Sequence, residues 1–211
     1  MEKRNRHDAL VVLIHGLGRT TASMLPLALR LRRAGFDVKR IGYPSTRLRV
    51  AEAVAHVRQR LASLAPGRLV DLIGHSLGGL IAVRLLREPG PLRVRRVVQI
   101  GSPNLGSAIA DRLGVLWPVR RLCGPAVLEL RAHRARTATD PRIAAIAGTG
   151  GFWKGSLAGP HDGTVALRSA WSGAAHRAAV PVLHSLLPAS ARVAALVAAF
   201  LRDGRFPVRA A

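Results

Sequence analysis

A serine with a glycine two positions away on each side is the clearest chemical feature of this sequence. The segment Gly74-His75-Ser76-Leu77-Gly78 follows an apolar run with strand character and leads into an apolar run with helix character. A sharp strand-to-helix turn would lift the Ser76 hydroxyl clear of a sheet. Glycines at both offsets would remove side chains that collide with neighbouring elements. The pattern also fits a glycine-rich turn with a capping serine, but its placement favours a nucleophile.

A nucleophilic serine needs a general base, and the chain offers eight histidines. His184 follows the apolar segment 178–183, at the carboxyl end of a predicted last strand. Ligands of parallel sheets bind at that edge, which favours His184 over His161, a loop histidine beside an acid. His15 closes the first predicted strand, a place that favours a role in packing and loop shape. The other five lie in a charged tail, on predicted helices, at the wrong strand end or too close to the serine: His7, His56, His75, His133 and His176.

The base in turn needs an acid to orient it. Asp162 is favoured because it follows a predicted fifth strand and precedes the base, giving the chain order serine, acid, base. Gly163 gives the backbone freedom to aim the carboxylate, although an ordinary Asp-Gly turn is the alternative. Asp71 lies inside a predicted strand and Asp140 precedes one. Asp111 follows the fourth strand and stays a rival.

Acyl transfer also needs donors for a developing oxyanion. The backbone N–H of Leu77, at the helix start, is one candidate, and the N–H of Leu17, just past the first strand in "HGLGRT", is the second. A glycine-rich turn without this role is the alternative for the second segment.

Alternating strand and helix patterns must position these groups. They predict parallel βαβ units in a three-layer α/β sandwich with a mostly parallel six-stranded sheet, built as one domain over 1–211. The predicted strands lie at 9–16, 36–44, 68–75, 94–103, 142–148 and 178–184, and the predicted helices at 21–35, 49–64, 77–88 and 189–204. The less regular stretch 104–140 is a candidate for a short cap.

Composition narrows the classes of partner. The net charge of +22 comes mostly from scattered arginines, without the aromatic interleaving that base stacking needs. This argues against nucleic acid and favours a simple compositional bias, with peripheral contact with an anionic membrane as the alternative. Cys123 is the single cysteine, and no H-E-x-x-H or Cys/His cluster predicts a metal or other cofactor. No cleavage site or membrane-length apolar run occurs, so a cytoplasmic protein is expected.

Five segments resemble the α/β-hydrolase family, specifically its small lipase- and esterase-like members. They are "LIHGLG" (13–18), "IGHSLGG" (73–79), "QIGSPNLGS" (99–107), "HDGTVAL" (161–167) and "VLHSLL" (182–187), and they occur in the family's order. The resemblance implies Ser76 as nucleophile, Asp162 as acid and His184 as base, with Leu17 and Leu77 as oxyanion donors. Ser102 replaces the threonine of a T-P-x-x-G-S stretch. Too few residues precede the first strand for the family's first two strands, and a large lid is not expected.

These observations predict a serine carboxylic-ester hydrolase that acts on small-molecule esters through an acyl-enzyme. Apolar residues near Trp117 and Trp153 could line an acyl pocket for lipid-like or other apolar esters, or could be ordinary core. An acyltransferase, thioesterase or lipid deacylase would use the same residues. A non-catalytic module that binds anionic lipid or nucleic acid is the third alternative. The sequence does not fix the oligomeric state.

Overall fold

Six strands form one parallel sheet. The computed structural model of the chain describes residues 8–106, 124–126, 129, 138–151 and 159–207. The strands are β1 (Leu10–Ile14), β2 (Val38–Ile41), β3 (Leu69–His75), β4 (Arg93–Ile100), β5 (Asp140–Gly148) and β6 (Ala174–Val180). They are ordered β2-β1-β3-β4-β5-β6 across the sheet, and every neighbouring pair is parallel. All six carboxyl ends therefore lie along one edge.

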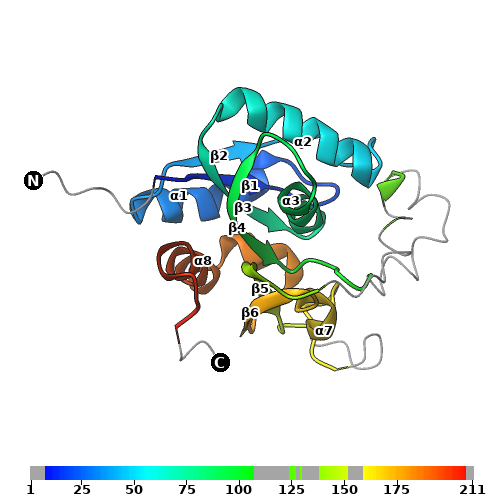
Figure 1. Ribbon diagram of the computed structural model, residues 1–211. Helices are drawn as coiled ribbons and strands as arrows, with labels where there is room; N and C mark the ends of the chain where they lie inside the picture. Colours follow the sequence, from blue (N-terminus) through cyan, green and yellow to red (C-terminus); the bar gives the residue numbers. More distant parts are fainter. Residues whose placement is uncertain (1–7, 107–123, 127–128, 130–137, 152–158, 208–211) are drawn as a thin grey trace, which may run out of the picture.

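Helices cover both faces of this sheet. On one face lie α1 (Leu25–Arg33) and α8 (Ala191–Asp203), and on the other lie α2 (Val50–Leu64) and α3 (Leu77–Arg87) (Figure 1). Three short elements accompany them: η1 (Thr21–Met24), α7 (Leu167–Ala170) and η2 (His184–Ala189). The fold is thus the three-layer α/β sandwich with a six-stranded sheet that the sequence predicts. No helix of the described residues is long and apolar enough to cross a bilayer.

The interior strand β1, between β2 and β3, is buried on both faces. Leu10, Val12 and Ile14 belong to the core shared with α2 and α3, whereas Val11 and Leu13 belong to the core shared with α1 and α8. Each such side chain stabilises the fold by about 1.5–3 kcal/mol when it leaves water. The loop that follows β1 is therefore anchored at its strand end, next to the end of β3.

The last strand differs from the prediction. It runs from Ala174 to Val180 instead of 178–184, so His176 lies within it and His184 begins η2. β6 is an edge strand, paired only with β5, and its first residues alternate buried and exposed positions. Small and charged residues are compatible with such an edge, which is why apolar content alone misplaces the strand. Most of the predicted cap at 104–140 lies outside the described residues.

Candidate active site

Ser76 occupies a strained backbone position between β3 and α3. Its φ of 53° and ψ of −120° make it the one non-glycine residue with positive φ in the described ranges. Such a conformation costs about 1–3 kcal/mol and persists only where the surroundings impose it. Here the Ser76 N–H donates to the Ile100 carbonyl of β4 at 2.9 Å, and α3 begins at the next residue. The strand therefore turns directly into the helix, as the sequence predicts.

The flanking glycines make this turn sterically feasible. A Cβ at position 74 would lie 2.2 Å from the backbone of Gly78, and one at position 78 would lie 2.4 Å from the Ile14 carbonyl oxygen. Real Cβ atoms do not approach backbone so closely. The start of α3 thus packs directly on β3 and on the end of β1, which brings the β1 loop beside Ser76.

His184 and Asp162 form a direct side-chain pair at the same edge. The Nδ1 atom of His184 lies 2.7 Å from Oδ2 of Asp162, and both side chains are largely buried. The His184 backbone N–H also donates to the Asp162 carbonyl at 2.9 Å. Two contacts, one from the ring and one from the backbone, therefore fix the imidazole relative to the carboxylate.

The second oxygen of Asp162 is committed to its own loop. Oδ1 accepts the backbone N–H groups of Thr164 at 2.9 Å and Val165 at 2.7 Å. Gly163, at a φ of 94°, allows the tight turn that brings these amides round. Since Oδ1 is held by two amides, Oδ2 is presented to His184 in one orientation. Val165 in this loop is buried, whereas Leu167 is only partly buried.

Gly101, the residue directly after β4, lies close to the His184–Asp162 pair. A Cβ on Gly101 would lie 3.1 Å from His184 Nδ1 and 3.2 Å from Asp162 Oδ2. The preceding residue, Ile100, accepts the Ser76 N–H. The serine backbone and the His184–Asp162 pair therefore meet at the end of β4.

The loop after β1 lies against the serine. A Cβ on Gly16 would be 3.1 Å from the Ser76 Cβ, so only glycine permits this approach without displacement. The Arg19 N–H donates to the Gly16 carbonyl at 3.3 Å, and the Gly18 N–H donates to Ser45 Oγ at 3.1 Å. These bonds shape the turn that contains Leu17, the residue directly after Gly16. Leu77 is the first residue of α3, where backbone N–H groups have no partner within the helix.

The buried side chain of His15 links this loop to Tyr43. Its Nδ1–H donates to the Gly16 carbonyl at 2.9 Å, while its Nε2 accepts the Tyr43 N–H at 3.3 Å. The two rings stack with centroids 4.5 Å apart. Burial lowers the pKa of His15 and raises the pKa of Tyr43. Both side chains are thus kept neutral and serve packing and loop shape, the role the sequence suggests for His15.

The rival residues have other partners. His161 Nδ1 accepts the Gly163 N–H at 3.0 Å, within its own loop. Asp71 is fully buried in β3 and forms an ion pair with Arg95, and Asp140 bonds Arg142 at the amino end of β5. The ring of His176 packs on Phe200. Several residues considered from the sequence lie outside the described ranges: His7, Asp111, Trp117, Cys123, His133 and Trp153.

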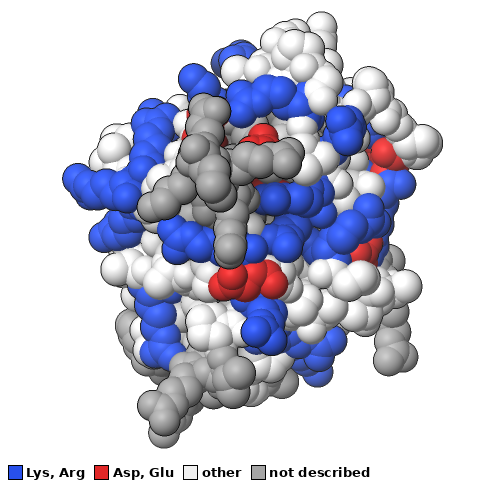
Figure 2. Space-filling view, turned by 60° about the vertical axis from the view of Figure 1, so that its left-hand side comes forward, with Lys and Arg blue, Asp and Glu red and all other residues white. Residues whose placement is uncertain are grey.

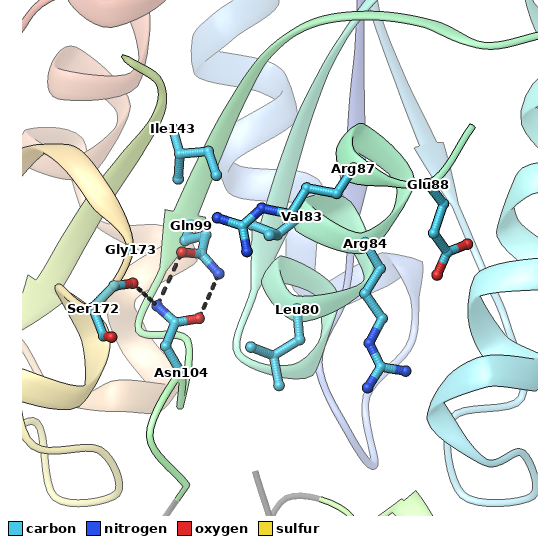
Figure 3. Close-up of a pocket in the computed structure, with 10 residues that line it drawn as sticks. All are labelled: Leu80, Val83, Arg84, Arg87, Glu88, Gln99, Asn104, Ile143, Ser172 and Gly173. Atoms are coloured by element: carbon cyan, nitrogen blue, oxygen red, sulfur yellow. Dashed lines mark hydrogen bonds between the residues drawn. The ribbon is translucent and has the colours of Figure 1, made fainter. Parts of the chain in front are cut away.

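A pocket of about 190 Å³ lies beside α3, away from these groups (Figure 3). At its base, Gln99 and Asn104 exchange two side-chain hydrogen bonds of 2.8 and 3.0 Å. Asn104 Nδ2 also donates to the carbonyls of Ala170 and Ser172. This network ties the loop after β4 to the segment between α7 and β6, so the "QIGSPNLGS" stretch contributes structure around the site.

His75 makes contacts with His184 that the sequence does not predict. Adjacent to the serine, it is a poor candidate for the base, yet its ring lies 4.8 Å from the His184 ring. Its Nε2 lies 3.0 Å from the His184 carbonyl oxygen. Burial, and secondarily the nearby His184, lower the pKa of His75 to about 3. No signal in the spacing predicts this contact, because the two residues are 109 positions apart.

No metal site accompanies these residues in the described part of the chain, where no group of three or more His, Cys, Asp or Glu side chains could hold an ion. The chemistry available there is that of a hydroxyl, an imidazole, a carboxylate and backbone amides.

A parallel sheet with a strained serine after its third strand, and an acid and a histidine after its last two, defines the class of α/β hydrolases. The family profile of the alpha/beta hydrolase fold matches residues 9–141. The chain belongs to this family.

Solved structures of low sequence identity share the fold. A mature lipase from Bacillus licheniformis is 20% identical, with a TM-score of 0.62 and 88% of each chain covered. The product of a Listeria innocua gene is 18% identical, with a TM-score of 0.61 over 96% of each chain. The RedJ thioesterase of Streptomyces coelicolor is 18% identical, with a TM-score of 0.58 over 94% of this chain and 91% of its own. No significant sequence match was found among curated proteins.

Proposed function

We propose that this α/β hydrolase is a serine hydrolase that cleaves carboxylic esters, with lipid-like or other apolar esters as its substrate class. One observation carries the proposal: the Asp162–His184 pair, 2.7 Å between Oδ2 and Nδ1, lies at the sheet edge where Ser76 adopts its positive φ. In this proposal Ser76 is the nucleophile, His184 the general base and Asp162 the orienting acid.

The first half-reaction transfers the acyl group to the enzyme. Asp162 accepts the Nδ1–H of His184, which leaves Nε2 with the lone pair needed to take the Ser76 proton. The Ser76 oxygen attacks the ester carbonyl carbon, and the resulting oxyanion accepts the N–H groups of Leu17 and Leu77. Each such donor contributes about 3 kcal/mol to transition-state stabilisation. The C–O bond to the alcohol then breaks, and His184 Nε2–H protonates the departing oxygen.

The second half-reaction uses the same groups with water. His184 removes a proton from a water molecule, whose oxygen attacks the acyl carbon. The tetrahedral intermediate collapses, Ser76 regains its proton from His184, and the carboxylic acid leaves.

Replacement of the nucleophile tests this proposal. The variant Ser76→Ala should lose hydrolysis of activated aryl esters by a factor of about 10⁴ or more, with an unchanged melting temperature. Ser63→Ala, on the exposed side of α2, is the matched control and should retain activity. A fluorophosphonate should label the wild type at residue 76 and fail to label Ser76→Ala. Undiminished turnover by Ser76→Ala would overturn the proposal.

The acyl donor and the acceptor decide which reaction of this chemistry the protein catalyses. Two of the structures that share this fold are a lipase and a thioesterase, which supports testing oxygen esters and thioesters side by side. A panel of aryl esters and acyl thioesters of increasing chain length measures the preference directly. Added primary alcohols that divert the acyl group from water would indicate transferase activity, and release of fatty acid from acylated lipid would indicate lipid deacylation.

A further inference from the structure

We propose that His75 is a positioning residue for the reaction: its side chain holds the backbone of His184 and sets the distance between the base loop and the loop that carries Leu17. The inference rests on the proposed function, in which His184 is the general base. His75 itself takes no proton in the reaction and touches no substrate.

The hydrogen-bonding pattern fixes the tautomer of His75. Its Nε2 lies 3.0 Å from the His184 carbonyl oxygen, which can only accept. Its Nδ1 is buried and has no partner among the described residues. A proton on Nδ1 would leave a buried donor unpaired and would set two acceptors against each other at Nε2. The neutral Nε2–H form is therefore the one that fits, with Nε2–H donating to the carbonyl.

This bond completes the restraint on residue 184. The His184 N–H donates to the Asp162 carbonyl, its ring Nδ1 contacts Asp162 Oδ2, and its carbonyl accepts from His75. The Asp162 contacts fix the position of His184 only relative to Asp162, and not relative to Ser76. The His75 contact is a direct side-chain link from the base to the serine segment, because residue 75 is covalently joined to Ser76.

The opposite side of the His75 ring faces the loop after β1. A Cβ on Gly16 would lie 3.2 Å from His75 Nδ1 and also 3.2 Å from the His75 carbonyl oxygen. His75 therefore lies between Gly16 and His184. A change in the size or position of its ring would alter the spacing of both loops around Ser76.

A purely packing role does not account for a histidine at this position. An apolar side chain of similar volume would fill the space without burying the unpaired Nδ1, and an unpaired buried polar atom costs stability. What the histidine adds is the Nε2–H donor at the His184 carbonyl. We therefore expect the donor to matter more for turnover than for stability.

Three substitutions separate the donor from the volume. In His75→Gln the side-chain amide nitrogen can occupy the place of Nε2, whereas His75→Met has the same length without a donor. His75→Asn is polar but too short to reach the carbonyl. We expect kcat for an aryl ester to fall tenfold or more in His75→Met and His75→Asn, and to stay within about threefold of wild type in His75→Gln. KM should change less than threefold in all three. His176→Met, which removes a histidine packed on Phe200 far from the site, should leave kcat unchanged.

A second measurement does not depend on turnover. The proton between His184 Nδ1 and Asp162 should give a downfield ¹H NMR signal in wild type and His75→Gln, and a weakened or exchange-broadened signal in His75→Met and His75→Asn. If wild type showed no hydrolysis, the proposed function would fail while this signal still decided the role of His75. Equal kcat values in all three variants, or an unchanged signal in all three, would overturn the inference.

Discussion

The two oxygens of the Asp162 carboxylate have different partners, and this division has a chemical consequence. Oδ1 is held by two backbone amides, whereas Oδ2 contacts His184. An amide side chain placed here would have to direct its oxygen to the two N–H groups. Its NH₂ group would then face Nδ1 of the imidazole.

Asp162→Asn is therefore expected to select the wrong tautomer of His184. Nδ1 would become an acceptor, Nε2 would carry the proton, and the ring could no longer accept the proton of Ser76. We expect kcat for an aryl ester to fall by about 10³–10⁴ with little change in KM. Asp140→Asn, which alters a carboxylate at the amino end of β5, is the control. Steady-state kinetics of both variants test this, and a loss below tenfold in Asp162→Asn would contradict the assignment.

Two buried histidines make folding sensitive to acid. Burial lowers the pKa of His15 and lowers that of His75 to about 3. The unfolded chain takes up protons on both residues below about pH 6.5, whereas the folded chain resists them. The free energy of unfolding should therefore fall as the pH decreases below 6.5, with the His75 contribution continuing toward pH 3.

Each of these histidines should contribute a slope of up to about 1.4 kcal/mol per pH unit. Urea unfolding between pH 7 and pH 5 measures the combined slope. The variant His75→Gln lacks one of the two groups and should show a smaller slope over this interval. Parallel curves for wild type and variant would contradict this explanation of acid sensitivity.

At the scale of elements, the Asn104 side chain connects the loop after β4 to the end of α7 and to the turn that precedes β6. Asn104 bonds Gln99 twice and the carbonyls of Ala170 and Ser172 once each (Figure 3). These contacts link β4, α7 and the turn before β6, which are separate in sequence.

Removal of this side chain should loosen the junction. Asn104→Ala leaves the buried Gln99 amide with unmet hydrogen bonds, so the free energy of unfolding should fall by about 1–3 kcal/mol. Gln59→Ala, on the exposed side of α2, should change it by less than about 0.5 kcal/mol. Denaturant unfolding of both variants provides the test, and equal losses would show that the network contributes little.

Regular elements were predictable where apolar periodicity is strong. β1 and β3 carry uninterrupted buried residues, and α8 has a Ser190 cap and a left-handed Gly204 at its ends, so their positions follow from the sequence. The edge strand β6 was misplaced because the apolar residues on both sides of Pro181 resemble a strand more than the segment 174–177 does, although a proline argues against one. The short helix η2 carries no pattern of its own, because contacts with distant residues stabilise it.

The same distinction applies to the candidate site. The turn at Ser76 was predictable from the glycines two positions before and after the serine, which relieve close backbone contacts. Asp162 and His184 were assigned to the loops after the last two strands from the order of strands along the chain. The contact from His75 to His184 could not be predicted, because it depends on how two loops approach each other in three dimensions.

At the scale of the whole molecule, positive charge dominates. The chain has 33 Lys and Arg residues against 11 Asp and Glu residues. Figure 2 shows one face on which basic side chains greatly outnumber acidic ones. On α1, the exposed side also presents two leucines one turn apart, Leu25 and Leu29, with Arg33 following. Charge and exposed apolar groups together suit the surface of an anionic bilayer.

We propose peripheral binding to such a bilayer. The protein should co-sediment with vesicles containing phosphatidylserine or phosphatidylglycerol at low ionic strength, and binding should weaken strongly in 0.5 M salt, a concentration at which the Debye length is about 4 Å. The double variant Leu25→Ser/Leu29→Ser should bind less at both salt concentrations. Leu64→Ser, which alters a comparably exposed leucine on α2, is the control. Equal binding to neutral and anionic vesicles would contradict the electrostatic part of the proposal.

The direction of β1 has a practical consequence. The chain enters this strand at Leu10, at the edge opposite the one where Gly16, Ser76 and His184 meet. A tether attached ahead of Asp8 would therefore hold the protein on a bead or an electrode by the edge of the sheet opposite the candidate site. The carboxyl-end loops would then face the bulk solution, so immobilisation through the amino terminus suits assays that need open access for bulky reagents.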